Sequence, residues 1–315
     1  MQIKLNIRRF DPEKGSRVHY EKFQVELDDS ATVLDALINI REYQDQSLAL
    51  RCSCRSAICG SCAMRINGGA KLACKTKATS VAPDGEEITV EPMGNQNVIR
   101  DLIVDLSMFW SKIRAVEPWL QPTGPEPEKE YIVPNQAMLD LTVAMNCIMC
   151  GACVSDCTSL EVDKNFLGPA ALAKAYRFVF DPRDGHKKER LEKYSEYSGV
   201  WDCTHCYFCV QVCPKDVAPM ERILNIREEA IKEGFTDNNG ARHSASFARS
   251  VKHSGWLDEG RLAVESHGYT NIPELLSLLP VGFRAMQAGK MPSPMHHKRP
   301  GSKYVKQIFE KLEDK

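Results

Sequence analysis

The side chains of this sequence with the clearest chemistry are its 13 cysteines, which fall in three groups within 315 residues. Five lie in 52–74, four in 147–157 and four in 203–213. The odd count excludes complete disulfide pairing, and the chain opens on an alternating strand pattern rather than an apolar signal segment. Cysteines grouped in this way are typical of thiolate ligands to metal.

The second and third groups repeat one spacing, C-x2-C-x2-C-x3-C, which is the pattern of ferredoxins with two [4Fe–4S] clusters. Three thiolates spaced in this way wrap a tight loop around one cube, while the fourth enters a helix directed toward the neighbouring cube. The fourth ligands are therefore expected to cross over. One cubane is predicted at Cys147, Cys150, Cys153 and Cys213, and the other at Cys157, Cys203, Cys206 and Cys209.

The first group contains the C-x4-C-x2-C spacing of plant-type [2Fe–2S] ferredoxins. Its predicted ligands are Cys54, Cys59, Cys62 and Cys74, which leaves Cys52 as a non-ligand thiol. Gly60 and Ser61 suit a loop whose backbone amides donate to cluster sulfurs. Zinc also takes four cysteines and is the alternative metal, although the triple C-x2-C-x2-C runs favour cubanes.

The residues before 117 predict a small mixed domain that positions the first group. Strands are predicted over 3–7, 23–27 and 88–90, a helix over 33–40 capped by Asp29 or Ser30, and a hairpin turn at Asn67-Gly68. Apolar residues at helical spacing also predict a helix over 98–116. These elements suit a β-grasp ferredoxin domain.

Five prolines between 118 and 134 predict an extended linker, and the residues after it show helical patterns. The expected fold class is α+β, with a β-grasp [2Fe–2S] domain followed by an all-α two-cubane domain of ferredoxin type. We expect a domain over 1–117, a linker over 118–134, a helical domain over 135–240 and a C-terminal extension for partner contacts over 241–315.

Charge and hydropathy exclude some roles for the chain. Lys and Arg number 41 against 42 Asp and Glu, so no positive field favours nucleic acid as a partner. The most apolar late stretch, 272–283, is interrupted by Glu274 and Pro280 and is too short to span a membrane. The chain itself is expected to be soluble, with membrane contact made through a partner.

The order of the predicted domains and several sequence segments together resemble the iron–sulfur subunit of succinate dehydrogenase and fumarate reductase. The likeness is carried by five segments: 55–62 (RSAICGSC), 98–105 (VIRDLIVD), 166–170 (FLGPA), 175–178 (AYRF) and 181–184 (DPRD). It implies an electron-transfer subunit of a quinone-linked oxidoreductase of the tricarboxylic acid cycle or anaerobic respiration, and leaves the direction of the current open. No dinucleotide fingerprint or acid–base site is present, so no catalytic residue for the organic substrate is expected on this chain.

The resemblance also implies partners and a location. The expected partners are a FAD-bearing flavoprotein and a membrane-anchoring subunit, with the quinone pool reached indirectly. The complex is expected to be peripheral on the cytoplasmic membrane, on the cytoplasmic side, or on the periplasmic side if a partner carries a signal. A stand-alone polyferredoxin is the rival function.

The sequence departs from most of this family at two places. Cys206 stands where most members lack cysteine, so a second [4Fe–4S] cluster is favoured over [3Fe–4S]. Cys157 is followed by Thr158-Ser159, without the tryptophans that help to form a quinone site. The segments 253–259 and 289–292 are similar to the small iron–sulfur subunit of heterodisulfide reductases, which implies either a partner with CCG domains or a role in such a complex. The basic run 296–299 is a solvated tail or a contact with anionic lipid.

Overall fold

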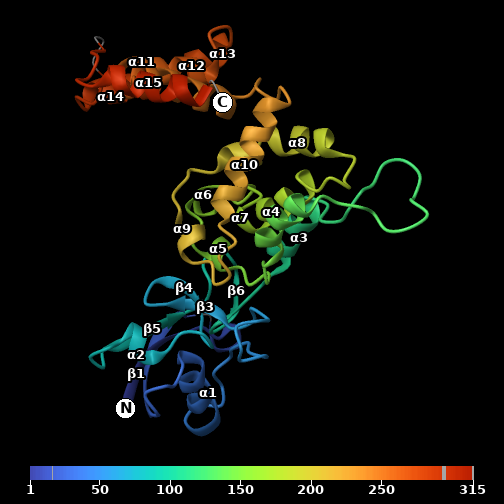
Figure 1. The fold of residues 1–315 in the computed structure, drawn as a ribbon. Coiled ribbons are helices and arrows are strands. Elements are labelled where there is room, and N and C mark those ends of the chain that lie inside the picture. Colours follow the sequence, from blue (N-terminus) through green and yellow to red (C-terminus); the bar gives the residue numbers. More distant parts are fainter. Residues whose placement is uncertain (16, 293–295, 314–315) are drawn as a thin grey trace. The chain divides into compact units, whose positions relative to one another are not determined.

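The computed structural model describes residues 1–15, 17–292 and 296–313 (Figure 1). Its contacts divide the chain into one compact unit over Met1–Ile226 and a second over Arg227–Lys315. All three cysteine groups lie in the first unit. The narrower ranges 1–117, 118–134, 135–240 and 241–315 stay predictions.

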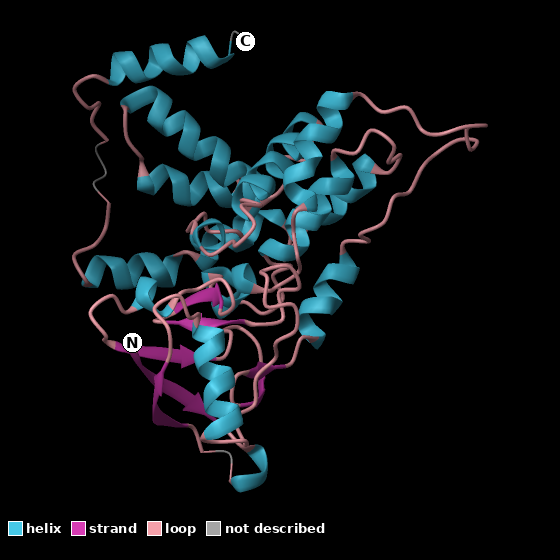
Figure 2. Cartoon of the chain, turned by 60° about the horizontal axis from the view of Figure 1, so that its bottom comes forward, coloured by secondary structure: helices cyan, strands magenta, loops and turns pink. Residues whose placement is uncertain are grey.

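A five-stranded sheet forms the start of the first unit, in the order β2-β1-β5-β3-β4. β1 and β5 are parallel, and the other neighbours are antiparallel. Figure 2 shows helix α1 across one face of this sheet. The strands are β1 (Gln2–Arg9), β2 (His19–Glu26), β3 (Ala63–Ile66), β4 (Gly69–Leu72) and β5 (Glu87–Glu91), with the short helices η1 (Pro12–Lys14) and α2 (Ala78–Val81) between them.

The predicted strands, first helix and hairpin of this domain are present. Alternate residues of β1 are buried beneath α1 (Val33–Tyr43), as the period-2 pattern requires. The N-cap of α1 is Thr32, not Asp29 or Ser30, because the Thr32 hydroxyl and the Asp35 carboxylate form a reciprocal capping box. Asn67 and Gly68 have φ of 49° and 80° and turn β3 into β4, as predicted.

The predicted helix over 98–116 is wrong in its first half. The chain forms a small antiparallel pair, β6 (Val98–Arg100) with β7 (Ile103–Val104), and only α3 (Ser107–Ala115) is helical. Asp101 causes the break: its φ is 44°, and its buried carboxylate accepts hydrogen bonds from Arg9 and from the Phe10 and Ala49 amides. These tertiary bonds hold the chain in a turn that the apolar spacing does not reveal.

The proline-rich segment after α3 forms neither helix nor strand, and Figure 1 shows it as a long loop. Its first residues are nevertheless fixed. Arg190 donates to the carbonyls of Val116, Glu117 and Trp119 and pairs with Asp184 at 2.9 Å. Asp184 is therefore the residue through which the 181–184 segment anchors this loop.

The rest of the first unit is helical, as predicted. Gly168 precedes the first turn of the buried helix α7 with a φ of 86°. The elements are α4 (Asn135–Met145), α5 (Ala152–Ser155), α6 (Thr158–Val162), α7 (Pro169–Val179), α8 (Lys187–Ser195), η2 (Val200–Asp202), α9 (Phe208–Gln211) and α10 (Pro219–Lys232), the last of which runs into the second unit.

The second unit is a set of helices built around a pair. α11 (Asn239–Ser254) packs on α12 (Glu259–His267) and on α15 (Ser302–Glu313). Glu265 of α12 pairs with Arg249 of α11 at 3.3 Å, and also with Arg261 of its own helix at 2.5 Å. The two remaining helices are α13 (Ile272–Ser277) and α14 (Leu279–Gln287), which have no buried residue.

Candidate iron–sulfur centres

The loop before β3 forms a cradle of amides around the first cysteine group. The Cys54 Sγ accepts backbone N–H groups from Ser56 and Ile58 at 3.4 Å and from Cys59 at 3.3 Å. The Ala57 amide reaches the Cys74 Sγ at 3.3 Å. The loop can turn these amides inward because Arg55 and Ala57 adopt left-handed φ of 55° and 56°. Amides aimed at sulfur suit a [2Fe–2S] cluster.

Cys59 and Cys62 lie in contrasting surroundings. The Ser61 hydroxyl lies 3.1 Å from the Cys59 Sγ, and this hydrogen bond is the main reason that the pKa of the exposed Cys59 falls to about 6. Burial, with a smaller contribution from the nearby Cys74 and Cys59, raises the pKa of Cys62 to about 12. Cys52 packs against the hydrophobic core of the sheet domain.

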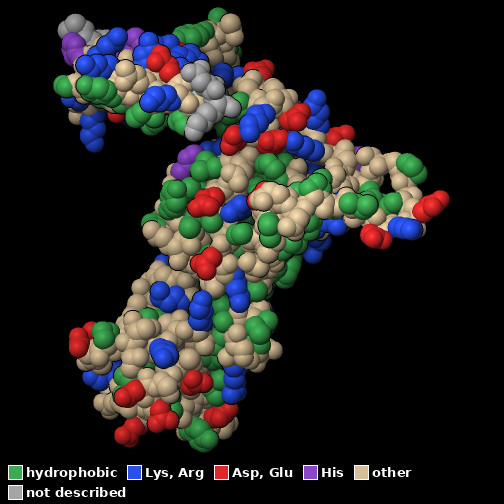
Figure 3. Space-filling view, viewed as in Figure 1, with side chains coloured by type: hydrophobic (Ala, Val, Ile, Leu, Met, Phe, Trp, Pro, Cys, Tyr) green, Lys and Arg blue, Asp and Glu red, His purple; other side chains and the backbone are tan. Residues whose placement is uncertain are grey.

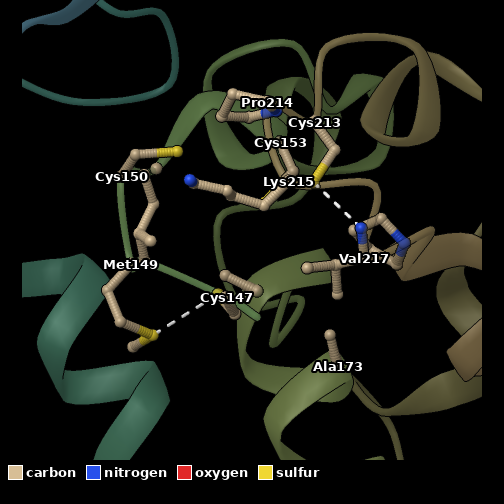
Figure 4. Close-up of a pocket in the computed structure, with 13 residues that line it drawn as sticks. Cys147, Met149, Cys150, Cys153, Ala173, Cys213, Pro214, Lys215 and Val217 are labelled. Carbon is tan, nitrogen blue, oxygen red and sulfur yellow. Dashed lines mark hydrogen bonds between the residues drawn. The ribbon is translucent and has the colours of Figure 1, made fainter. Parts of the chain in front are cut away.

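A pocket brings together the four cysteines predicted for the first cubane. Cys147, Cys150, Cys153 and Cys213 all line it, together with Lys215 (Figure 4). Cys213 thus lies beside the loop of the preceding cysteine group, as the predicted crossover requires. The Val217 amide donates to the Cys213 Sγ at 3.4 Å. Burial raises the pKa of Cys150 to about 11 and that of Cys153 well above its usual value.

The loops that carry the second and third groups repeat one backbone conformation. Met149 and Gly151 have φ of 57° and 79°, and the equivalent His205 and Tyr207 have 56° and 67°. Each loop then enters a one-turn helix, α5 or α9, at the equivalent residue. The repeated spacing in the sequence is therefore a repeated structure.

The remaining four cysteines also lie near one another. Burial, together with the neighbouring Cys203, Cys157 and Cys206, raises the pKa of Cys209 to about 12. Cys206 is exposed, and its pKa shifts the other way. Burial opposes its ionisation, but hydrogen bonds with Thr158 and the Phe208 amide outweigh burial and lower its pKa. The hydrogen bond with Thr158 therefore places the Cys206 thiol next to the segment that carries Cys157.

These three sets of side chains fit iron–sulfur clusters by their donor chemistry. Each set offers four thiols, and bound iron would replace the protons that burial holds on the buried ones. The structure thus brings the predicted ligands together in the predicted groups, while their assignment as ligands stays a prediction. Across the described ranges, no three His, Cys, Asp or Glu side chains converge on a single-ion site.

The contact between the sheet domain and the cysteine loops depends on residues that sequence reasoning missed. The Asn95 side-chain amide donates to the carbonyls of Val154 and Cys157 at 2.9 Å. The Gly94 amide donates to the Ser155 hydroxyl, and the Ala70 amide to Asp156 at 2.8 Å. Asn95 follows a glycine in a short turn and has a φ of 60°, but no pattern in the sequence distinguishes it from an ordinary turn residue.

Two family models match the chain. The first, a 2Fe-2S iron-sulfur cluster binding domain, matches residues 4–111. The second, a 4Fe-4S dicluster domain, matches residues 143–217. They confirm the predicted kinds of cofactor, and the helical domain is of the dicluster type.

Curated relatives are iron–sulfur subunits. The chain is 33% identical over 295 residues to the 8-methylmenaquinol:fumarate reductase iron-sulfur subunit of Wolinella succinogenes, covering 92% of this chain and 91% of the relative. It is 36% identical to the fumarate reductase subunit of Haemophilus influenzae, covering 73% of this chain and 94% of the relative. At 92% coverage, the first of these two alignments extends into 241–315.

A solved structure has the same fold. The Mycobacterium smegmatis Sdh1 complex in the apo form contains a chain that matches with a TM-score of 0.68 at 26% identity, covering 75% of this chain and 98% of that one. In the part of this chain that the structure describes, no helix combines the length and apolar character of a membrane span.

Proposed function

The chain belongs to the family of iron–sulfur subunits of succinate dehydrogenases and fumarate reductases, and from that premise we propose how it carries electrons. Electrons pass between a FAD-bearing flavoprotein and a quinone-linked partner through three clusters held in series. The [2Fe–2S] site of Cys54, Cys59, Cys62 and Cys74 exchanges electrons with the flavoprotein. The organic substrate reacts on that partner, and this chain supplies the conducting path.

The observation that carries this proposal is the grouping of the thiols. Cys213 lines one pocket with Cys147, Cys150 and Cys153, although four other cysteines lie between Cys153 and Cys213 in the sequence. This crossover places the two cubanes side by side. The order of conduction is then the [2Fe–2S] site, the Cys147 cubane and the Cys157 cubane. A stand-alone electron shuttle has less support, because the relatives are subunits of reductases and dehydrogenases.

Cys206 supports a second [4Fe–4S] cluster at the end of this path. Its thiol is exposed, has a lowered pKa and lies near the other three thiols of its group. A thiolate in this state is available to hold a fourth iron. The third centre is therefore [4Fe–4S] in our proposal, with ligands Cys157, Cys203, Cys206 and Cys209.

The C-terminal extension supports a second protein partner, on the quinone side of the path. In α14, Leu279, Phe283 and Met286 lie on one helical face and are each at least 60% exposed. Figure 3 shows hydrophobic side chains along this edge of the second unit, beside Lys and Arg. We call these three residues the α14 face. It suits a partner subunit, anchored to the membrane or carrying CCG domains, and we place the complex on the cytoplasmic side of the membrane.

The test is a preparation of the whole complex, purified without oxygen through a tag on this chain. We expect a flavoprotein to copurify, and three paramagnetic clusters to appear in EPR spectra as the sample is reduced. Iron and acid-labile sulfide should match one [2Fe–2S] and two [4Fe–4S] clusters. Succinate or a reduced quinone analogue should reduce the clusters. The Wolinella relative makes an 8-methylmenaquinol analogue a suitable second donor.

The opposite results are equally clear. A colourless preparation containing zinc and no sulfide would contradict the iron–sulfur assignment. A stable monomer that carries all three clusters but binds no flavoprotein would support the shuttle instead.

A further inference from the structure

The loops of the first and second cysteine groups touch at Gly60. A β-carbon built on Gly60 would lie 2.8 Å from the Cβ and 2.9 Å from the Cα of Cys150, and 3.2 Å from the Ile148 carbonyl oxygen. Real β-carbons do not approach other atoms at 2.8 Å. Only a residue without a side chain therefore allows the chain beside Cys59 to touch the chain that carries Cys150.

The contact is fixed from both sides. Gly60 is buried although Cys59 beside it is exposed, and the Ala63 amide holds the Gly60 carbonyl at 3.2 Å. Ile148 and Cys150 pack against the hydrophobic core of the sheet domain. Gly60 also has a φ of 74°, a conformation that other residues rarely adopt.

We propose that Gly60 is a positioning residue that sets the separation of the first two clusters, with Cys59–Gly60 and Cys150 forming the shortest protein path between them. The proposal rests on the proposed function, since it requires Cys59 and Cys150 to be ligands. The step is a one-electron exchange in which one cluster is oxidised as the other is reduced, and no bond is made or broken. The rate of electron tunnelling through protein falls steeply with distance. Even a small increase in the distance between these two loops should therefore slow the exchange.

The test compares Gly60→Ala with Gly68→Ala in the intact, cluster-loaded complex. Gly68 has a φ of 80°, but nothing lies within 4 Å of its added β-carbon. Both alanines therefore carry the cost of a left-handed φ, and only the first pushes two cluster loops apart. The pair separates general destabilisation from a change in cluster spacing.

For Gly60→Ala we expect unchanged iron and sulfide content and a weaker magnetic interaction between the reduced [2Fe–2S] and [4Fe–4S] centres in EPR. The rate of electron exchange between the two centres, measured by rapid freezing and EPR, should fall several-fold. Gly68→Ala should keep the wild-type interaction and rate. Wild-type interaction and rate in fully loaded Gly60→Ala would overturn the proposal.

A second measurement covers the case in which Gly60→Ala does not take up its clusters. If Gly60→Ala does not load, relaxation measurements on the reduced wild-type complex decide, because loops in contact require a strong magnetic interaction between the two centres. A weak interaction there would contradict the proposal while leaving the proposed function intact. A wild-type protein without a [2Fe–2S] signal, by contrast, would contradict the proposed function itself.

Discussion

At the scale of single residues, the cysteine types and spacing were enough to predict all three thiol groups, but not what surrounds them. The crossover of Cys213 followed from the repeated spacing because short loops leave the chain little choice of path. Asn95 and Asp101 could not be predicted. Each acts through bonds to residues far away in the sequence, and no local pattern marks such bonds.

The Ser61 hydroxyl is expected to tune the first cluster. Removing its hydrogen bond to the Cys59 Sγ in Ser61→Ala withdraws a group that stabilises negative charge on the sulfur. One such bond is worth about 1 kcal/mol, so the midpoint potential should fall by at most about 40 mV, since only the strengthening of the bond on reduction shifts the potential. A redox titration followed by the [2Fe–2S] EPR signal measures this. Ser56→Ala is the control, since its hydroxyl donates to the Cys54 carbonyl instead; equal shifts in both variants would refute the assignment.

Cys206 is expected to decide the type of the third cluster. Cys206→Ser replaces the exposed thiolate and should convert this centre to [3Fe–4S], with the loss of about one iron per protein. The oxidised variant should then show a [3Fe–4S] EPR signal that the wild type lacks. Finding that signal at full intensity in the oxidised wild type would show that Cys206 is not a ligand. Cys52→Ser, which changes the spare thiol, should leave the spectrum unchanged.

At the scale of elements, period-2 and turn patterns predicted the sheet, while the apolar spacing over 98–116 misled. Ile99, Leu102, Ile103 and Leu106 would share a helical face, but the bonds made by Asp101 stabilise a turn instead. Secondary structure that depends on one buried carboxylate lies beyond any local pattern. Strands β1 and β5 could be predicted because alternate residues are buried along each of them, and this alternation is visible in a short stretch of sequence.

The α11–α12 pair should lose stability in acid because of Glu265. Burial opposes its ionisation, yet Arg261 and Tyr269 lower its pKa to about 2, below the 4.5 of the unfolded chain. This contribution is complete above about pH 5 and is lost as the pH falls toward 2. By pH 4 the loss should be about 1 kcal/mol or less, since both arginines are partly exposed.

Hydrogen exchange of residues 239–267 in the intact protein, measured from pH 7 to pH 4, tests this linkage. Exchange in the wild type, corrected for its intrinsic pH dependence, should become faster toward pH 4. Glu265→Gln should be less protected at pH 7 and change little with pH. Glu259→Gln, an exposed position at the start of α12, should behave like the wild type. If Glu265→Gln keeps the full acid response, another group is responsible.

At the scale of the whole molecule, the predicted cluster ligands and the α14 face fall in different units. The cysteines and their supporting bonds lie in Met1–Ile226, and the α14 face lies in Arg227–Lys315. The sequence predicted a C-terminal extension because its cysteines end at 213. The exposed face of α14 emerged only from the structure, since the same apolar residues could equally have formed a core.

Polar substitutions on the α14 face should therefore weaken assembly without affecting the clusters. Leu279→Ser with Phe283→Ser removes exposed apolar surface, so the EPR spectra and thermal stability should stay as in the wild type. Recovery of the quinone-side subunit with a tagged chain should fall several-fold. Ile132→Ser, an exposed apolar residue of the proline-rich loop, serves as the control. Normal recovery of that subunit with the double variant would exclude this face as its binding site.

The crossover of Cys213 has a consequence for biosynthesis. Translation supplies the last proposed ligand of the [2Fe–2S] site at residue 74, so that site can mature while the chain is still being made. With the proposed ligands, neither cubane would have its four thiolates until translation had passed Cys209 and Cys213. The two therefore become competent for insertion almost together, and a nascent chain interrupted between the two motifs could hold neither cubane complete. Their maturation is in this sense a single event.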